Sequence, residues 1–554
     1  MKYPNMGKSN KLLSSAIALI ALSKGLTQVQ AADSLCQTAT PLVPSFNNSI
    51  LTILYDEEYK SDSIERLSGA VQIPTIIQDV NPDPADNPDY YAEFTKLHEY
   101  LKETFPLVHE HLTLELVNHY GLLYTWQGNN TSLQPMLFTA HQDVVPVENT
   151  TLDQWDFPPF SGHYDDATDF IYGRGAFDVK NLIIAHMEAI EKLLEDGYST
   201  ERTVLLAYGF DEESGGALGA GYIAPLLQDR YGENGVMVMF DEGAGVLKLD
   251  DSHYVATVTN AEKGTMNLVV TVNGKGGHSS SPPDHTTIGV AADFITVLEN
   301  NPFGVQFNVQ SPLYGLLTCA AEYSDDLPSD LKNLILGAAD DTELETSLAN
   351  FLVSNDMTKN YVRTTQAVDI VNGGVKINAL PESAYFIVNH RIAFGSSVEE
   401  TRQRVMKYAN ETAVKFDYGL VFEGNEIIPA TDNGYIDVDL QRLLEPAPVT
   451  ASSGPVWDLM AGTVSNLFEN NIFAQKGEDS DIFITTAVVT GNTDSRHYWN
   501  VTDTIYRFTG GVTDPEILAT MHTVNEHMSM DAHLQSTAFF YEFIVNANEH
   551  GSSI

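Results

Sequence analysis

Apolar segments of this chain are repeatedly followed by side chains that bind metals or transfer protons. One such segment leads to His141, a later one leads to the adjacent Glu212 and Glu213, and Asp178 follows a glycine-flanked turn between them. In α/β proteins, side chains that follow the carboxyl ends of parallel strands meet at one edge of the sheet. We therefore expect a catalytic or metal-binding site at such an edge.

The order of the apolar segments predicts an α/β fold. Residues 136–139, 204–208 and 236–240 are short and apolar, and continuous runs of this kind are typical of strands buried on both faces. Residues 179–194 instead carry apolar side chains at the spacing of one helix face. Strands that alternate with helices predict a mostly parallel sheet with helices on both sides.

A chain of 554 residues is too long for one ordinary domain. After about residue 260 the pattern changes to separate strands and helices around a glycine-rich loop at 273–278, which predicts a smaller α+β domain. We assign residues 50–262 and 430–554 to the larger, catalytic domain and residues 263–429 to the inserted domain. Residues 300–365 fit neither pattern and are expected to be an addition.

Residues 1–32 have the features of a secretory signal peptide. Three lysines precede the apolar run from Leu12 to Leu22, and Ala31 offers a small side chain for cleavage. The run is about half the ~20 residues that span a membrane, so cleavage is favoured over an uncleaved anchor, which stays the alternative. The mature chain is then expected in the extracellular medium or the vacuolar lumen, without a stable membrane anchor.

Two further features bear on this location. Asn-Xaa-Ser/Thr sequons fit passage through a eukaryotic secretory route. They begin at Asn47, Asn129, Asn130, Asn149, Asn410 and Asn500. The chain has two cysteines, Cys36 and Cys319, and nothing in the sequence positions them together, so their pairing stays open.

The charge of the chain limits its partners. Acidic residues outnumber basic residues by 75 to 29, which gives a net charge of −46. Such a chain repels phosphate backbones, so a nucleic-acid partner is not expected. The charge provides a solubilising surface, and it also suits a protein that works in acidic surroundings.

Two pairs of neighbouring side chains point to metal-assisted chemistry. His141 and Asp143 are two residues apart, so in a strand they face the same way and the carboxylate can hold one imidazole nitrogen. The adjacent Glu212 and Glu213 repel each other, and burying both requires a cation or a raised pKa. One of them can bind a metal while the other exchanges protons with water. Taken alone, each pair also fits an ordinary surface turn.

The remaining candidate ligands are Asp178, which alone would be a helix N-cap, together with Glu242 and His522. Asp241 is the alternative to Glu242, because the register at a strand end is uncertain by one residue, and His497 is the alternative to His522. Nitrogen and oxygen ligands of this type suit zinc, with cobalt or manganese as substitutes. A carboxylate shared between two ions would hold them ~3.5–4 Å apart.

Seven stretches of the sequence resemble a known family. They are FTAHQDVVPV at 138–147, GRGAFDVKN at 173–181, FDEESGG at 210–216, GGHSS at 276–280, KINALPE at 376–382, TDSR at 493–496 and HTVNE at 522–526. Together, and in this order, they resemble the dinuclear zinc exopeptidases, a family that includes aminoacylase, carboxypeptidase S and the secreted N-acyl-amino-acid hydrolases. The likeness is greatest to the carboxypeptidase S branch, the Gly-Xaa carboxypeptidases of fungi.

This resemblance implies a zinc-exopeptidase fold with a lid and a site with two zinc ions. His141 would bind one ion and His522 the other, Asp178 would bridge both, and Glu213 and Glu242 would complete the two sites. The family also implies a cis peptide bond after Asp178. The inserted domain would act as a lid and could mediate a homodimer.

The same resemblance implies the catalytic roles. Asp143 would orient His141, and Glu212 would be the general base that takes a proton from the attacking water. His278, in the lid, would stabilise the oxyanion, in many relatives from a partner subunit. The free carboxylate of the substrate would be held by Asn378, Arg391 and Arg496.

Three functions are compatible with these residues. The first is a zinc carboxypeptidase that removes the C-terminal residue from short peptides. The alternative is a hydrolase or synthase of N-acyl amino acids, with the same core and a cleft that accepts a long acyl chain. A non-catalytic binding glycoprotein is the third, but loss of Glu212 or of a metal-binding carboxylate would be its signature, and all of these residues are present.

Overall fold

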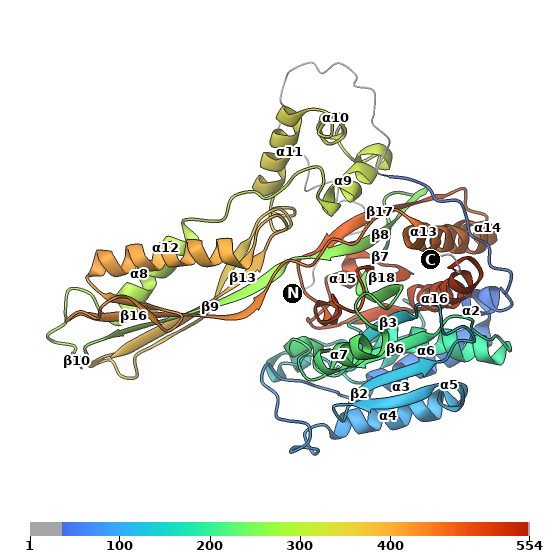
Figure 1. Ribbon diagram of the computed structural model, residues 1–554, viewed down its shortest axis with the longest axis horizontal. Helices are drawn as coiled ribbons and strands as arrows, with labels where there is room; N and C mark the ends of the chain where they lie inside the picture. The colour runs from blue at the N-terminus through green and yellow to red at the C-terminus, as the bar shows by residue number, and fades with distance from the viewer. Residues whose placement is uncertain (1–35, 552–554) are drawn as a thin grey trace.

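The computed structural model describes residues 36–551 and has two unequal lobes (Figure 1). The larger lobe is built on an eight-stranded sheet, and the smaller lobe contains a separate six-stranded sheet that projects from it. The fold is thus α/β with a second, smaller sheet domain, which confirms the predicted class. The proposed signal peptide, residues 1–32, lies outside the described residues.

The central sheet is mixed, with a parallel group of strands in the middle. Its order is β1 (Thr113–Val117), β2 (Gly121–Trp126), β6 (Val204–Gly209), β3 (Met136–His141), β7 (Val238–Lys248), β18 (Ile505–Val512), β8 (His253–Glu262) and β17 (Asp481–Val489). Strands β6, β3, β7 and β18 run parallel to one another, whereas β1 and β2 are antiparallel additions at one edge. The carboxyl ends of β6, β3 and β7 therefore open on one side of the sheet.

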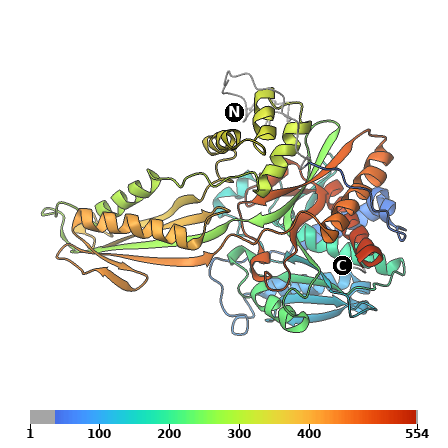
Figure 2. The same cartoon turned by 45° about the horizontal axis from the view of Figure 1, so that its top comes forward.

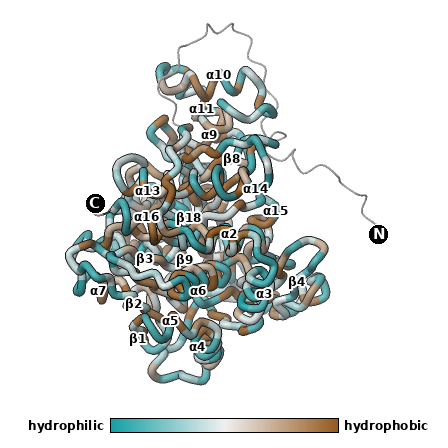
Figure 3. Tube along the Cα trace, turned by 90° about the vertical axis from the view of Figure 1, so that its right-hand side faces the viewer, coloured by the Kyte–Doolittle hydropathy of each residue, from teal (hydrophilic) through white to brown (hydrophobic). Residues whose placement is uncertain are grey.

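Helices cover both faces of this sheet because successive strand side chains point to opposite faces. Phe138 packs in one cluster with α6 and α16, whereas its neighbour Leu137 packs in another with α7. Figure 3 shows apolar residues gathered inside this lobe. Its helices are α2 (Ile50–Tyr55), α3 (Glu57–Val71), α4 (Ala92–Thr104), α5 (Pro106–His111), α6 (Lys180–Glu195), α7 (Ala220–Tyr231), α13 (Pro455–Ser465), α14 (Ala474–Lys476), α15 (Pro515–Leu518) and α16 (Met530–His550).

The smaller lobe is a sheet with helices on one face. Its strands follow the order β11 (Thr365–Gly373), β13 (Ser383–Ile392), β9 (Gly264–Gly274), β16 (Gly434–Leu444), β14 (Gly419–Phe422) and β15 (Asn425–Ile428). Helices α8 (Thr287–Glu299) and α12 (Val398–Phe416) lie side by side along it (Figure 2). Strand β16 pairs with β9, so this sheet extends to Leu444, beyond the boundary at residue 429 that the sequence suggested. We call this lobe the lid.

Two small sheets complete the fold. One joins β10 (Gly277–His278) to β12 (Ala379–Leu380) at the end of the lid that is farthest from the larger lobe (Figure 1). The other joins β19 (His527–Ser529), β5 (Phe170–Tyr172) and β4 (His163–Asp165) in the larger lobe.

Residues 300–365, expected to be an addition, are largely helical, and their helices pack on the larger lobe, whereas Phe303 at the start of the segment contacts His390 of the lid strand β13. The segment contains α9 (Pro312–Tyr323), α10 (Ser329–Gly337) and α11 (Thr342–Ser354). Helix α9 lies against the edge strand β17. A disulfide joins Cys319 of α9 to Cys36, and this bond settles the pairing that the sequence left open.

Loss of this disulfide is expected to lower the stability of the larger lobe. The bond closes a sequence separation of 283 residues, and loops of such length gain the most from cross-linking in the chain-entropy account. The double variant Cys36→Ser, Cys319→Ser should lose about 2–4 kcal/mol of unfolding free energy and melt at a lower temperature. Calorimetry with and without reductant tests this, because reductant should lower the melting temperature of the wild type and leave the variant unchanged. Equal melting of all four samples would contradict the prediction.

A buried carboxyl group in α16 should make stability depend on pH. Glu542 is fully buried, and burial raises its pKa to about 8 from an ordinary 4.5, while a hydrogen bond from Asn466 opposes this. The folded chain therefore holds this proton more tightly than the unfolded chain, and the stability it contributes below pH 4.5 is lost as the pH rises towards 8.

Glu542→Gln removes this titration. We expect its melting temperature, measured relative to the wild type, to rise steadily between pH 4.5 and pH 8. At pH 8 its unfolding free energy should exceed that of the wild type by roughly 1 kcal/mol or more, compared with their difference at pH 4.5. The exposed Glu58→Gln serves as the control and should show no such trend. A difference between Glu542→Gln and wild type that stays constant with pH would show that this carboxyl group does not couple folding to protonation.

Candidate metal centre

Three of the residues expected to bind metal lie on or directly after the neighbouring parallel strands β3, β6 and β7. His141 is the last residue of β3, and the neighbouring β6 ends just before the short 3-10 helix Glu212–Ser214. The sequence suggested that Glu242 follows a strand that ends at residue 240. Strand β7 instead continues past Glu242 and forms a hairpin with β8, so this glutamate lies within the strand. Gly243 is needed for this path, because a Cβ there would lie 2.6 Å from the carbonyl oxygen of Arg507.

The two oxygens of Asp178 face two different histidines. Its Oδ1 lies 3.1 Å from Nε2 of His141, and its Oδ2 lies 2.9 Å from Nε2 of His522. Glu242 stands beside the first histidine, with its Oε2 3.6 Å from Nε2 of His141. Glu213 stands beside the second, with its Oε1 3.0 Å from Nε2 of His522. The five residues thus form two histidine–carboxylate groups that share Asp178. We call these five residues the cluster.

Asp143 connects one of these groups to the two adjacent glutamates. Its Oδ1 lies 3.5 Å from Nδ1 of His141, whose closer partner is the Asp143 carbonyl oxygen at 3.0 Å. The two carboxylate oxygens accept the backbone N–H groups of Glu212 and Glu213 at 3.1 and 3.0 Å. Asp143 therefore fixes the imidazole and the glutamate turn relative to each other.

The carboxylates of the cluster are largely buried, whereas His522 is exposed. Burial raises the pKa of Glu213, with Asp178 adding to this, and burial raises the pKa of Glu242 to about 7. Hydrogen bonds to Asp178 and Glu213 raise the pKa of His522 to about 10. Burial opposes protonation of His141, but neighbouring carboxylates, led by Glu242, raise its pKa well above the usual value. The carboxylates thus favour a positive charge on both imidazoles, and a metal cation bound between these side chains would neutralise the same negative charge.

Glu212 is buried beside the cluster and is held by an arginine. Nη2 of Arg496 donates to Oε1 of Glu212 at 2.6 Å, and Nε of Arg496 donates to the Thr493 carbonyl oxygen at 2.9 Å. Burial raises the pKa of Glu212 well above its usual value, although Arg496 opposes the shift. A carboxyl group with a raised pKa next to a metal site is suited to accept and return a proton.

The geometry separates the two pairs of alternative ligands. Asp241 is buried, and its carboxylate accepts from Thr139 Oγ1, from the next backbone N–H and from the Ser495 N–H, so it supports the strand ends and does not face the histidines. His497 directs its Nε2 to the carbonyl oxygen of Gly215 at 2.9 Å, away from Asp178. Glu242 and His522 are therefore the members of each pair that join the cluster.

One supporting residue was not predicted from the sequence. Glu526 is fully buried, and its Oε1 accepts the backbone N–H groups of Gly175, Phe177 and Asp178 at 2.9–3.1 Å, while Oε2 pairs with Arg174. This carboxylate shapes the turn that presents Asp178, where the peptide bond to the next residue is cis, as the resemblance implies. Its position four residues after His522, at the end of a matched stretch, was the available signal.

The lid residues are not brought to the cluster in this chain. His278 and Asn378 are exposed near the β10–β12 pair, at the far end of the lid (Figure 1). Arg391, in contrast, lies at the inner end of β13, where its Nη1 donates to Oδ1 of Asn492 at 2.8 Å. Burial lowers the pKa of Arg391, and the positive charge of Arg496 lowers it further. Of the four expected substrate and oxyanion contacts, the two arginines are the ones near Glu212.

The donor set fits divalent metal ions. Two triads have ligand atoms within 4.8 Å of one another: His141 with Asp178 and Glu213, and His141 with Glu212 and Glu242. Imidazole nitrogens combined with carboxylate oxygens are ligands that suit zinc and similar ions. Glu212 belongs to the second triad, and its Oε1 accepts from Nη2 of Arg496.

Comparison with known proteins identifies the family. The sequence pattern of peptidase family M20/M25/M40 matches residues 137–546, a range that contains every member of the cluster. The chain belongs to this peptidase family. Carboxypeptidase S of Saccharomyces cerevisiae is 51% identical over 516 residues, which cover 93% of this chain and 89% of that protein. The family and this relative confirm that the M20/M25/M40 chain is a metallo-exopeptidase of the carboxypeptidase type.

Two further proteins place this peptidase among its relatives. The N-fatty-acyl-amino acid synthase/hydrolase of Bos taurus is 33% identical over 547 residues, covering 96% of this chain and 94% of that protein. A metallo-carboxypeptidase from Sulfolobus solfataricus is 17% identical and covers 87% of this chain and 98% of that structure, with a TM-score of 0.60. The second likeness concerns the fold alone, and it supports the α/β assignment.

Proposed function

We propose that this chain is a zinc-dependent carboxypeptidase that removes the C-terminal residue from short peptides of the Gly-Xaa type. The observation that carries the proposal is the shared Asp178, whose two oxygens face His141 and His522, with Glu212 held beside them. The 51% identity to carboxypeptidase S supports the same substrate class.

Two zinc ions are proposed for the cluster. His141 and Glu242 would hold one ion, His522 and Glu213 the other, and Asp178 would supply one oxygen to each. When bound, the ions supply Lewis acidity that polarises the amide carbonyl and lowers the pKa of water in the site.

The side chains of this chain then move one proton and hold one carboxylate. Glu212 takes a proton from the water that attacks the carbonyl carbon, and it gives this proton to the amine nitrogen as the carbon–nitrogen bond breaks. Arg391 and Arg496 are the nearby cations for the free carboxylate of the substrate, which a guanidinium can bind through two hydrogen bonds. A substrate carboxylate that takes over Arg496 would also release Glu212 from its present ion pair.

His278 and Asn378 are proposed to act in a homodimer formed through the lid. Both are exposed at the lid tip, far from the cluster of their own chain (Figure 1). In this arrangement the lid tip of one protomer would reach the cluster of its partner and stabilise the oxyanion.

Mixing two inactive variants tests this arrangement. Glu212→Gln and His278→Ala chains, unfolded together and refolded, should regain about a quarter of wild-type activity, because half of randomly paired dimers are hybrids with one intact site. Each variant refolded alone is the control and should stay inactive. A mixture no more active than the two parents would show that His278 acts within its own chain or not at all.

The alternative substrate is an N-acyl amino acid, which the Bos taurus relative favours through its 33% identity. Parallel assays of a blocked Gly-Leu dipeptide and an N-oleoyl amino acid, with zinc restored, distinguish the two. Cleavage of the dipeptide with little action on the oleoyl compound supports the carboxypeptidase proposal. Preference for the oleoyl compound moves the function to lipid amides, and failure of both overturns the substrate class.

We also propose that the enzyme passes through a secretory route to the medium or a vacuolar lumen. All six sequon asparagines are exposed, as glycosylation requires, and the disulfide is typical of an oxidising compartment. Among residues 36–551, no helix is both long and apolar enough to cross a bilayer.

A further inference from the structure

The loop that carries Arg496 rests on a buried ion pair that the proposed reaction does not use. Glu262 is the last residue of β8, Arg507 lies in β18, and the two are 0% and 1% exposed. Nε of Arg507 lies 2.8 Å from Oε1 of Glu262. Neither residue is a member of the cluster. Burial removes the hydration of both charges at a considerable cost in free energy, so a pair at this place calls for an explanation.

One serine joins this pair to the loop of residues 493–497, which we call the arginine loop. Oγ of Ser495 accepts from Nη2 and Nε of Arg507 at 2.6 and 3.1 Å and donates to Oε2 of Glu262 at 3.3 Å. The backbone N–H of Ser495 donates to Oδ2 of Asp241 at 3.0 Å. Ser495 is fully buried and directly precedes Arg496, so the backbone at the arginine is fixed by side chains from three strands of the central sheet.

Arg496 depends on this backbone for its direction. Its Nε is held by the carbonyl oxygen of Thr493 within the same loop, and its Nη2 reaches across to Glu212. The guanidinium therefore moves when the arginine loop moves, and a displacement of about 1 Å at a substrate contact can cost ~10²-fold in rate. The contacts of Ser495 limit such a displacement.

The neighbouring Asn492 connects the second arginine to the same place. Its Nδ2 donates to the Lys263 carbonyl oxygen at 2.6 Å, and its Oδ1 accepts from Nη1 of Arg391 at 2.8 Å. Lys263 follows Glu262 directly, where the chain leaves β8 for the lid. Both arginines proposed for the substrate carboxylate are thus placed relative to residues 262–263.

Stability alone does not account for the pair. Nη1 of Arg507 is buried and has no hydrogen-bond partner among residues 36–551, and a buried donor without an acceptor is costly. Apolar side chains of similar volume often stabilise a fold as well as a buried ion pair does, or better. A role in fixing the arginine loop explains why two charged side chains with directed hydrogen bonds occupy this position.

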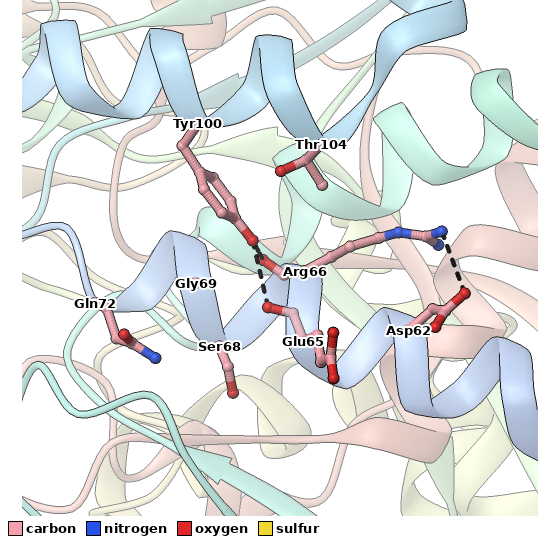
Figure 4. Close-up of a pocket in the computed structure, with 8 residues that line it drawn as sticks. All are labelled: Asp62, Glu65, Arg66, Ser68, Gly69, Gln72, Tyr100 and Thr104. Atoms are coloured by element: carbon pink, nitrogen blue, oxygen red, sulfur yellow. Dashed lines mark hydrogen bonds and ion pairs between the residues drawn. The ribbon is translucent and has the colours of Figure 1, made fainter.

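A second buried pair of the same kind offers a matched comparison. Oε1 of Glu188 lies 3.3 Å from Nη1 of Arg66, and Oγ of Ser63 donates to Oε2 of Glu188 at 3.0 Å. Figure 4 shows Arg66 on α3, with Asp62 and Tyr100 beside it. These residues belong neither to the cluster nor to the arginine loop. A serine that contacts a buried ion pair can therefore be altered here without touching the proposed substrate contacts.

We propose that Ser495, fixed by the buried Glu262–Arg507 pair, is a positioning residue that directs Arg496 to the free carboxylate of the substrate. This inference rests on the proposed peptidase function and deepens it, because it names what makes the site selective for a free carboxyl terminus. Ser495→Ala leaves the ion pair and Arg496 in the chain but removes the hydroxyl contacts between the pair and the arginine loop. Weaker binding of a carboxylate is the expected consequence.

A double-mutant cycle on the full-length, zinc-loaded protein tests the proposal. Ser495→Ala should raise the KM for blocked Gly-Leu and the dissociation constant of the product leucine, measured by calorimetry, about tenfold each. Arg496→Ala should raise both by at least as much. Adding Ser495→Ala to Arg496→Ala should raise neither further, because the serine acts through the arginine. The control Ser63→Ala should bind leucine like the wild type even where its melting temperature falls.

Glu262→Gln is the second variant, because it weakens the ion pair and keeps a hydrogen-bonding side chain. It should weaken leucine binding in the same way, and only where Arg496 is present. Unchanged leucine binding in both variants, the same loss with and without Arg496, or an equal loss in Ser63→Ala would overturn the positioning role. If neither the wild type nor Ser63→Ala hydrolyses blocked Gly-Leu, or if Arg496→Ala binds leucine normally, the failure lies with the proposed function, and the inference falls with it.

Discussion

Glu212→Gln is expected to lower kcat for a blocked Gly-Leu dipeptide by about 10³–10⁴-fold. The amide of glutamine cannot take a proton from water or return it to the leaving amine. The hydrogen bond from Arg496 to Oε1 can be kept by the new carbonyl oxygen, so the local structure should persist. Stopped or steady-state assays with zinc restored measure the loss, and the KM should change little because the arginines are untouched.

Metal content decides what that loss means. Glu212 belongs to one of the two possible donor triads, with His141 and Glu242. A role of Glu212 as a metal ligand is therefore the rival explanation for a loss of activity. We expect the purified Glu212→Gln chain to bind as much zinc as the wild type. Loss of zinc together with activity would make Glu212 a ligand and remove the proposed general base.

The second large effect is expected at Asp178. Asp178→Ala removes the one carboxylate that faces both histidines, so it should weaken zinc binding at both positions and abolish turnover. The affinity loss should exceed the ~10–100-fold that follows the loss of an outer-shell partner. His497→Ala is the matched control, since this histidine lies nearby but contacts the Gly215 carbonyl oxygen. Near-normal zinc content in Asp178→Ala would contradict the bridging role.

Local patterns in the sequence were enough to predict the central strands and most of the cluster. Continuous apolar runs place β3, β6 and β7 side by side, because strands buried on both faces have little freedom in where they pack. Ligands directly after such strands, such as Glu213, follow from the strand ends. The position of Glu242 within a strand was harder to predict. Strand β7 continues through a glycine-containing stretch into a hairpin with β8, and this hairpin depends on contacts with residues distant in the sequence.

Features set by long-range packing could not be predicted. Cys36 and Cys319 meet only because α9 packs on β17, and the lid boundary shifts because β16 pairs with β9 across a long insertion. The role of Glu526 could not be predicted beyond its place at the end of a matched stretch, because a single carboxylate in a polar stretch is usually solvated and only the folded turn brings backbone N–H groups to it. The distance of His278 from the cluster likewise depends on where the lid projects.

The most direct test of the two-zinc account is a titration of zinc-free protein with zinc. Bound zinc per chain is followed by native mass spectrometry, and hydrolysis of blocked Gly-Leu is followed in the same samples. We predict that activity is absent without zinc, that it appears as the second ion binds, and that binding ends at two ions per chain. Full activity with one ion per chain, or hydrolysis by the zinc-free protein, would contradict it.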